Sequence, residues 1–108
     1  MDRQVIGFQG RTNKVADSCY SFWIGATLAM LNVLQDSDVL GCKEFLLQHC
    51  QSHGPNGGFC KVPDTYPDLL HSFYSVCWLA LVEHPQLKKL DPRLGIPTDR
   101  LPEHLINL

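Results

Sequence analysis

Hydrophobic positions divide the chain into three helices joined by polar, turn-rich segments. Residues 22–34 are apolar on almost every side, which predicts a helix that begins at Asp17 and is buried on most faces. Residues 39–50 alternate apolar and polar positions at a spacing of three to four, the pattern of an amphipathic helix. A second, nearly all-apolar helix is predicted from Asp68 to about Glu83.

The intervening segments carry the residues that end helices. Residues 1–16 contain Gly7, Gly10 and Asn13 and are predicted to be irregular, and residues 54–58 form a turn cluster. Beyond residue 84 the prolines 85, 92, 97 and 102 predict a loop and short turns, with a brief last helix from Pro102 to Leu108. No segment alternates with the period of a strand, so the predicted fold class is all-α.

The sequence repeats itself with an offset of 51 residues. Gly7-Phe8 recurs as Gly58-Phe59, and Asp17 recurs as Asp68. The same offset relates further pairs: Ser21 and Ser72, Phe22 and Phe73, Leu28 and Leu79, Ala29 and Ala80. A repeat of this length in pairs of helices predicts stacked helical hairpins. Because such arrays need about three repeats or more, a chain with barely two is expected to be part of a larger array.

Composition excludes several classes of protein. The 108 residues suit one small domain, and a formal net charge of −2 argues against a nucleic-acid binder. The longest apolar segment, residues 22–34, is interrupted by Gly25, Thr27 and Asn32, so we expect no integral membrane protein. Five cysteines without a C-x-x-C pair or a signal peptide predict reduced thiols and a cytoplasmic location, with Cys42, Cys60 and Cys77 as small buried hydrophobes.

A candidate metal site follows from the repeat. Asp17 and Cys19 can converge only if Asp17 is the N-cap of its helix and Cys19 lies in the first turn, where the helix dipole favours the thiolate. Asp68 holds the equivalent place, so His71 lies in the first turn of the second helix. Stacked hairpins bring the two helix starts to one end, which offers zinc three ligands and one open position. A cap, a core thiol and a polar core histidine are the alternative, which spacing alone leaves open.

A second cluster has metal-ligand spacing in part. Cys50 and His53 are three residues apart and Cys60 follows, but no second pair completes a set of four ligands. This cluster is the weaker of the two hypotheses.

Cations and aromatic residues gather around the same helix starts. Arg11, Lys14 and Lys61 precede them and, together with helix N-termini, suit a phosphate or diphosphate, although solvated surface charge explains them equally. Aromatic side chains lie one turn deeper: Phe22, Trp23, Phe73 and Tyr74. Core packing is their default role, and an apolar ligand lying against them is the alternative.

Two motifs resemble a known family. Residues 7–23, GFQGRTNKVADSCYSFW, resemble the signature of the protein prenyltransferase β subunits, and residues 63–71, PDTYPDLLH, resemble their following repeat. The similarity extends from Arg3 to about Glu83. It implies an α/α toroid of helical hairpins, in which an isoprenoid diphosphate alkylates the cysteine thiol of a C-terminal CaaX motif.

The resemblance also implies a role for each candidate residue. Zinc is bound by Asp17, Cys19 and His71, and the CaaX cysteine is its fourth ligand. The diphosphate is held by cations and a phenol: Arg11, Lys14, Tyr20 and Lys61. The lipid lies against Trp23 and Tyr74. The implied partners are a prenyltransferase α subunit and CaaX-terminated proteins such as small GTPases. The expected catalytic residues are Asp17, Cys19, Tyr20, Lys61 and His71.

Within the family, residues 23–28 and 58–61 most resemble the type I geranylgeranyltransferases. The resemblance places Lys61 at the position where farnesyltransferases have an Asp that binds magnesium. A lysine supplies a fixed positive charge there, so magnesium is not expected to be required. Leu70 fits the geranylgeranyl class as well, whereas Tyr74 suits the farnesyl class. A farnesyltransferase β subunit is therefore the alternative within the family.

The family β subunit is several times longer than 108 residues. The resemblance therefore places residues 1–108 in the C-terminal portion of its toroid domain, and we expect the isolated chain not to catalyse prenyl transfer. A non-catalytic helical-repeat fragment is a further alternative. A related toroid lyase or cyclase is disfavoured because the sequence has no Asp-rich motif of the kind such enzymes use.

Overall fold

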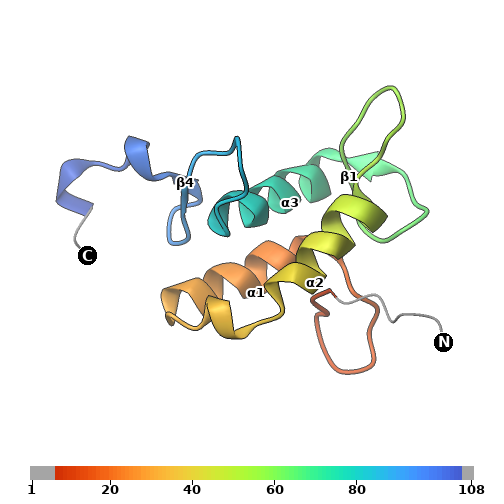
Figure 1. Cartoon of the computed structure of the whole chain (residues 1–108), viewed down its shortest axis with the longest axis horizontal. Helices are drawn as coiled ribbons and strands as arrows, with labels where there is room; N and C mark the ends of the chain where they lie inside the picture. Colours follow the sequence, from red (N-terminus) through yellow and green to blue (C-terminus); the bar gives the residue numbers. More distant parts are fainter. Residues whose placement is uncertain (1–6, 106–108) are drawn as a thin grey trace.

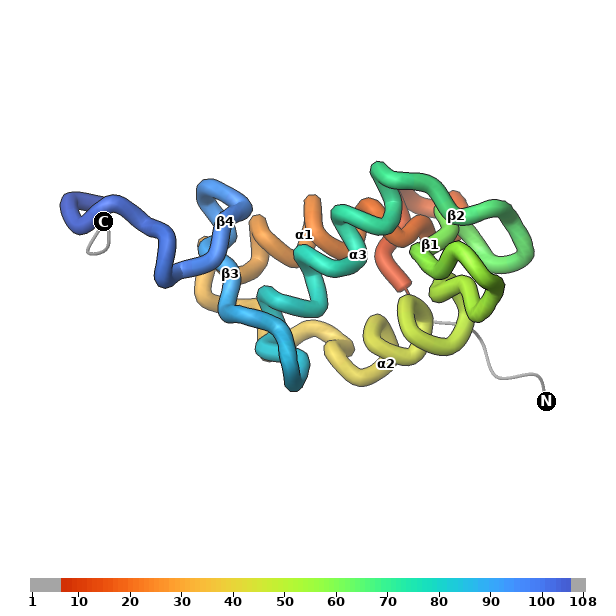
Figure 2. The backbone as a smooth tube through the Cα atoms, turned by 90° about the horizontal axis from the view of Figure 1, so that it is seen from above, coloured from red at the N-terminus to blue at the C-terminus, as the bar shows by residue number. Residues whose placement is uncertain are grey.

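A computed structural model describes residues 7–105, which form three α-helices and their connections. Helices α1 (Ser18–Met30) and α3 (Leu69–Leu81) lie side by side along their length, as Figures 1 and 2 show. Helix α2 (Val39–Glu44) continues directly into a π-helical segment, η2 (Phe45–Cys50), and together they span the predicted amphipathic helix. The predicted all-α class and its three helices are confirmed.

The connections contain short ordered segments. Three single 3₁₀ turns are present: η1 (Leu34–Asp36), η3 (Thr98–Arg100) and η4 (Glu103–Leu105). Two antiparallel ladders pair β1 (Phe59–Cys60) with β2 (Pro67–Asp68), and β3 (Leu90–Asp91) with β4 (Ile96–Pro97). The expectation that no strand forms is wrong at these four segments. Each is two residues long and closes a loop, which is too short to produce an alternating pattern.

The first helix ends earlier than the hydrophobic pattern predicts. Apolar residues continue to Leu34, but α1 stops at Met30 because Asn32 takes the left-handed conformation, with φ of 60°. The predicted last helix is present only as the single turn η4, and residues 106–108 lie outside the described part of the chain. A left-handed residue after a helix turns the chain sharply, whatever the polarity that follows.

The repeat is reproduced in the backbone. Glu83, which is 51 residues after Asn32, ends α3 with a φ of 59°, and in both helices the next amide donates to a carbonyl five residues earlier at 2.9 Å. The loops match as well: the Gln9–Ala16 bridge has the same relative position as the Cys60–Pro67 pair. The two halves of the chain are therefore copies of one helix-and-loop unit.

The core lies between α1, α3 and η2. Trp78 is fully buried, and its indole packs against Gly25 of α1, where a Cβ would lie 2.6 Å from Cδ1 of the indole. The close approach of α1 and α3 therefore depends on this glycine. The surrounding buried cluster is formed by Cys42, Phe45, Leu46, Cys50, Phe59 and Leu79. All five cysteines are free and buried, as predicted for Cys42, Cys60 and Cys77.

In the described residues, no helix combines the length and the apolar character that a membrane crossing needs.

The β3–β4 hairpin depends on one buried carboxylate. Asp91 is 7% exposed and accepts the backbone N–H groups of Arg93 at 2.9 Å and Leu94 at 3.1 Å. The guanidinium of Arg93 donates to it at 3.1 Å and also reaches the carbonyl of Leu105 at 2.9 Å. Burial alone would raise the pKa of Asp91, but these hydrogen bonds outweigh it and hold the pKa below its ordinary value.

Replacing Asp91 with asparagine is expected to lower the free energy of unfolding by about 1–2 kcal/mol at pH 7, because charge-assisted bonds are lost. A carboxyl with a depressed folded pKa stabilises the protein above its unfolded pKa, about 3.9, and ceases to do so as the pH falls through the folded value. The difference between the two proteins should therefore shrink below about pH 4. Urea unfolding at pH 7 and pH 3 measures it. Asp99→Asn, which alters an exposed carboxylate paired with Lys88 at 3.0 Å, is the control and should cost much less stability than Asp91→Asn, because solvent screens this pair. A pH-independent difference would contradict the prediction.

Candidate metal and anion site

Asp17 occupies the N-cap of α1. Its backbone is extended, with φ of −135° and ψ of 132°, and its Oδ1 accepts the N–H of Cys19 at 2.9 Å. The side chains of both residues are buried, with residue exposures of 6% and 4%. The predicted N-cap is confirmed, and it places a carboxylate and a thiol on the same side of the helix start.

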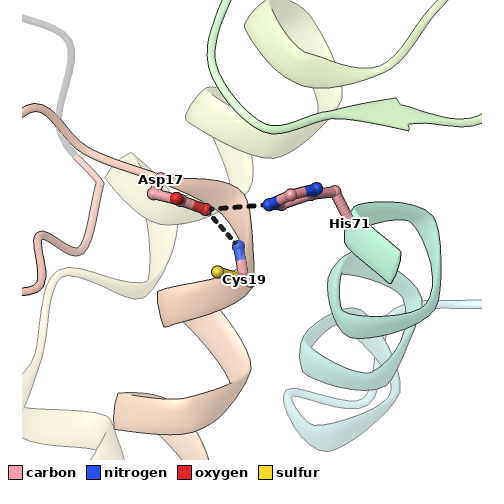
Figure 3. Close-up of side chains that lie close together, drawn as sticks. All are labelled: Asp17, Cys19 and His71. Carbon is pink, nitrogen blue, oxygen red and sulfur yellow. Dashed lines mark hydrogen bonds and ion pairs between the residues drawn. The ribbon is translucent and has the colours of Figure 1, made fainter. Parts of the chain in front are cut away.

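His71 reaches the same point from α3. Asp68 caps that helix by accepting the N–H of His71 at 2.8 Å, so the histidine lies in the first turn as predicted. Its ring points across to α1, with Nε2 3.5 Å from Oδ1 of Asp17 (Figure 3). The side chain of His71 is 12% exposed. The two helix starts therefore face each other across this cluster.

The three potential ligand atoms of Asp17, Cys19 and His71 lie within 4.8 Å of one another. Zinc bonds of about 2.0–2.3 Å in a tetrahedron separate neighbouring ligand atoms by roughly 3.5 Å, so a small inward movement completes the geometry. One carboxylate oxygen, one sulfur and one imidazole nitrogen are ligands that zinc takes, and three ligands leave one position open. The residues therefore fit a catalytic-type zinc site.

The competing cysteine–histidine cluster does not assemble. Cys50 and Cys60 are buried but His53 is exposed, and the Cys60 thiol donates to the carbonyl of Thr65 at 2.9 Å. Among residues 7–105, the only group of three or more metal-binding side chains is that of Asp17, Cys19 and His71.

The thiol of Cys19 is less acidic than the helix dipole alone predicts. The pKa of Cys19 is raised to about 12, first by burial of the thiol and then by the hydrogen bond and negative charge of Asp17. The expectation that the helix start favours the thiolate is wrong for the metal-free chain, because burial of the thiol and the neighbouring carboxylate together outweigh the dipole. A bound divalent cation reverses this balance, since coordination deprotonates a thiol.

His71 has a second carboxylate partner. Its Nδ1 lies 2.7 Å from Oδ2 and 2.9 Å from Oδ1 of Asp68. The backbone N–H of His71 is the main reason that the pKa of Asp68 lies below its ordinary value, and the ring adds to the effect. Sequence reasoning identified Asp68 as a cap only. The signal for its second contact is the three-residue spacing, which brings the two side chains together on the first turn of a helix.

A pocket of about 290 Å³ adjoins the metal cluster and shares Asp17 with it. Its lining contains every residue predicted to hold an anion, together with two further loop residues: Gly10, Arg11, Lys14, Val15, Tyr20 and Lys61. The ammonium of Lys61 is 4.0 Å from Oδ2 of Asp17. The structure therefore brings three cations and a phenol together beside the carboxylate, in a space large enough for a diphosphate.

Backbone conformation shapes this pocket. A Cβ on Gly10 would lie 2.5 Å from the Tyr20 ring, so only glycine lets the loop pass over the phenol. Asn13 takes a φ of 66°, and the amide of Lys14 donates to the carbonyl of Arg11 at 3.2 Å, which closes the turn. Sequence reasoning treated Gly10 as a turn residue and missed its place in the pocket wall.

Lys61 is held by main-chain contacts to α1. The amide of Ser18 donates to the carbonyl of Lys61 at 2.9 Å, and the buried Ser18 hydroxyl donates to the carbonyl of Cys60 at 2.7 Å. The loop of the second repeat is thereby fixed to the helix start of the first.

A row of aromatic rings leads away from the pocket. Tyr20, which lines the pocket, contacts Trp23 edge to face at 5.0 Å, and Trp23 contacts Tyr74 in the same way at 5.3 Å. Tyr74 also stacks on Phe22 at 5.7 Å and meets Phe73 at 5.3 Å. Trp23 and Phe73 are 43% and 56% exposed, so one side of the row is open. The predicted aromatic group is assembled, with an apolar surface beside the cations.

Paired helical hairpins with this cluster at their starts correspond to a known fold class. The sequence profile of the prenyltransferase alpha-alpha toroid domain matches residues 1–96, and the chain belongs to this family. This confirms the predicted resemblance and the predicted toroid fold.

Individual relatives show which members of the family this chain is similar to. The chain is 46% identical over 91 residues to the geranylgeranyl transferase type-1 subunit beta of Arabidopsis thaliana, covering 84% of this chain and 24% of that protein. It is 36% identical over 94 residues to the corresponding subunit of Dictyostelium discoideum, covering 87% and 26%. It is 34% identical over 80 residues to the protein farnesyltransferase subunit beta of Saccharomyces cerevisiae, covering 71% of this chain and 18% of that protein.

A solved structure agrees with these sequences. The protein geranylgeranyltransferase-I of Candida albicans, complexed with GGPP, superposes with a TM-score of 0.79 at 34% identity, covering 86% of this chain and 26% of that one. The chain therefore spans about a quarter of the length of its relatives.

Proposed function

We propose that residues 1–108 contribute the zinc site and the diphosphate pocket of a type I protein geranylgeranyltransferase β subunit. The observation that carries the proposal is the convergence of Asp17, Cys19 and His71 beside a pocket with three cations. Such a subunit, paired with an α subunit, transfers a geranylgeranyl group from geranylgeranyl diphosphate to the cysteine thiol of a C-terminal CaaX motif. The chain is then one part of the toroid, and it is inactive alone.

Each part of the site has a task in this reaction. Zinc held by Asp17, Cys19 and His71 would lower the pKa of a substrate thiol at its open position. Arg11 and Lys14 neutralise the charge that develops on the departing diphosphate. Because Arg11 and Lys14 already line the pocket, they need not rearrange as the charge on the diphosphate develops.

Tyr20 and Lys61 complete the diphosphate pocket. Tyr20 offers a phenolic hydroxyl to a phosphate oxygen, and Lys61 supplies a fixed positive charge where a magnesium ion would otherwise be needed. Magnesium is therefore not required in this proposal. The open aromatic row of Trp23 and Tyr74 receives the apolar chain of the isoprenoid.

The proposal also covers the substrate proteins, the partner subunit and the location of the reaction. CaaX-terminated proteins such as small GTPases supply the thiol, the α subunit completes the enzyme, and the reaction takes place in the cytoplasm. The exposed side of the aromatic row supports incorporation into a larger ring, because the described residues do not cover it.

A farnesyltransferase β subunit is the second candidate, and Tyr74 is the observation that favours it. The ring of Tyr74 contacts three other aromatic side chains at the centre of the row. Compared with the phenylalanine that is more common in the geranylgeranyl class, its hydroxyl adds bulk where the lipid would pass, which suits the farnesyl class. A non-catalytic helical-repeat fragment is the remaining candidate. It would keep the fold and bind neither zinc nor diphosphate.

Binding of inorganic pyrophosphate tests the pocket. Lys61→Ala is expected to weaken binding about tenfold, because one charge-assisted contact is lost. Lys61→Asp is expected to bind pyrophosphate only when magnesium is added, since the carboxylate then holds a cation in place of the ammonium. Isothermal titration with and without magnesium measures both effects.

Lys89→Ala is the matched control, because Lys89 pairs with Glu83 at 3.7 Å at the C-terminal end of α3, away from the helix starts. It should bind pyrophosphate as the wild-type chain does. Equal weakening by Lys61→Ala and Lys89→Ala would show that the anion senses only net charge and would overturn the proposed pocket.

A further inference from the structure

His71 is held between two carboxylates that contact different ring nitrogens. Nδ1 faces Asp68, at 2.7 Å from Oδ2 and 2.9 Å from Oδ1, whereas Nε2 faces Asp17 at 3.5 Å from Oδ1. Figure 3 shows the ring of His71 directed edge-on toward Asp17 and Cys19. The histidine therefore has one nitrogen turned toward the metal cluster and the other turned away.

The contact with Asp68 determines which nitrogen can bind a metal. An ionised carboxylate can only accept hydrogen bonds, so Nδ1 must carry the proton that joins it to Asp68. In the neutral ring the lone pair is then on Nε2, the atom that faces Asp17 and Cys19. Metal-bound histidines commonly donate their second N–H to a carboxylate, which fixes both the tautomer and the ring orientation.

The repeat shows that this arrangement is a specialisation of a cap. Asp17 and Asp68 are equivalent N-caps, and each accepts one backbone N–H of its helix. Asp17 is buried in the metal cluster, whereas the side chain of Asp68 is 46% exposed and bonds the ring of His71. The equivalent aspartate is thus a candidate metal ligand in the first copy, as Asp17, and the hydrogen-bond partner of a candidate ligand in the second, as Asp68.

We propose that Asp68 is a positioning residue for metal binding, which holds His71 with Nδ1 protonated and Nε2 directed at the ion. The proposal rests on the proposed zinc site formed by Asp17, Cys19 and His71. Asp68 itself does not touch the metal or the substrate. Its contribution beyond capping is the contact with the imidazole ring.

Two substitutions separate the cap from the ring contact. Asp68→Ser retains a good N-cap but is too short to replace both contacts with Nδ1. Asp68→Asn also retains the cap, but its NH₂ group can donate to Nδ1, which favours the opposite tautomer, with the proton on Nε2. Asp38→Asn is the matched control, because Asp38 caps α2 by accepting the N–H of Gly41 at 2.8 Å and lies outside the cluster of Asp17, Cys19 and His71.

Zinc affinity of the full chain, measured by competition with a chromophoric chelator, is the first readout. Asp68→Asn is expected to weaken zinc binding about 10- to 100-fold, and Asp68→Ser less, while Asp38→Asn leaves it unchanged. Thermal unfolding of the metal-free variants should show similar stability for all of them. Wild-type zinc affinity in both Asp68 variants would overturn the proposal, because a residue that only caps α3 predicts that result.

The ring nitrogens of His71 give a second readout that needs no metal. Nitrogen-15 NMR of the metal-free wild-type chain should show Nδ1 protonated, and Asp68→Asn should shift the proton away from Nδ1. An unprotonated Nδ1 in the wild-type chain would refute the role of Asp68. If the wild-type chain binds no zinc while Nδ1 is protonated as expected, the proposed zinc site fails and the assignment of the ring orientation to Asp68 remains supported.

Discussion

Replacing Cys19 or His71 with alanine is expected to abolish zinc binding under conditions in which the wild-type chain binds close to one ion. Structural zinc sites with four ligands bind with about 10–16 kcal/mol, so each ligand contributes roughly 3 kcal/mol, which corresponds to about a hundredfold in affinity. The Asp17–Cys19–His71 cluster has three ligands from the chain, so the loss of one leaves only two. Metal content after dialysis, measured by mass spectrometry, gives the stoichiometry directly.

The matched control is Cys77→Ala. This thiol is equally buried but packs with Ala80 and Leu90, outside the metal cluster. The variant should retain close to one zinc per chain. If the wild-type chain binds none, or if Cys77→Ala loses zinc as completely as Cys19→Ala, the metal site and with it the catalytic proposal must be abandoned in favour of a non-catalytic fragment.

Trp78→Ala is expected to have the largest effect on stability, lowering the free energy of unfolding by about 3–5 kcal/mol. Trp78 of α3 is fully buried between the core cluster and Gly25 of α1, so its truncation leaves a cavity about the size of an indole. Because small domains are stable by only about 5–15 kcal/mol, this change removes much of the total. Urea unfolding followed by circular dichroism measures it.

Two comparisons show whether packing is the cause. The Nε1 of Trp78 has no hydrogen-bond partner among the described residues, so Trp78→Phe keeps most of the volume and should cost less than about 1.5 kcal/mol. Trp23→Ala removes an indole that is 43% exposed and should cost much less than Trp78→Ala. Equal losses at Trp23 and Trp78 would show that burial does not determine the effect.

Most of the fold could be predicted because the hydrophobic pattern and the repeat agree. Long apolar runs after Asp17 and Asp68 predicted α1 and α3, and the offset between them predicted that the two helices form equivalent units. The end of α1 was not predictable from apolar residues, because the stop depends on the left-handed backbone of Asn32 rather than on polarity. The two-residue ladders escaped prediction because they are set by loop closure and carry no periodic signal.

The candidate site could be predicted only as far as local geometry determines it. N-cap placement of Asp17 and Asp68 was sufficient to bring Cys19 and His71 to the same end. The raised pKa of Cys19 could not be predicted, since it depends on burial and on the proximity of the Asp17 carboxylate across the first turn. The fit of Tyr20 against Gly10 likewise depends on a tertiary contact, because the two residues lie in different elements.

The loop that carries Lys61 is attached to α1 through two carbonyl groups of its main chain, which accept the amide and hydroxyl of Ser18. Neither contact involves the Lys61 side chain. The identity of the residue at this position can therefore change while the backbone of the pocket stays in place. In the proposed function, Lys61→Asp therefore exchanges a fixed cation for a carboxylate without removing either backbone contact. The main-chain attachment thus separates the charge that the loop presents to the pocket from the contacts that hold the loop to α1.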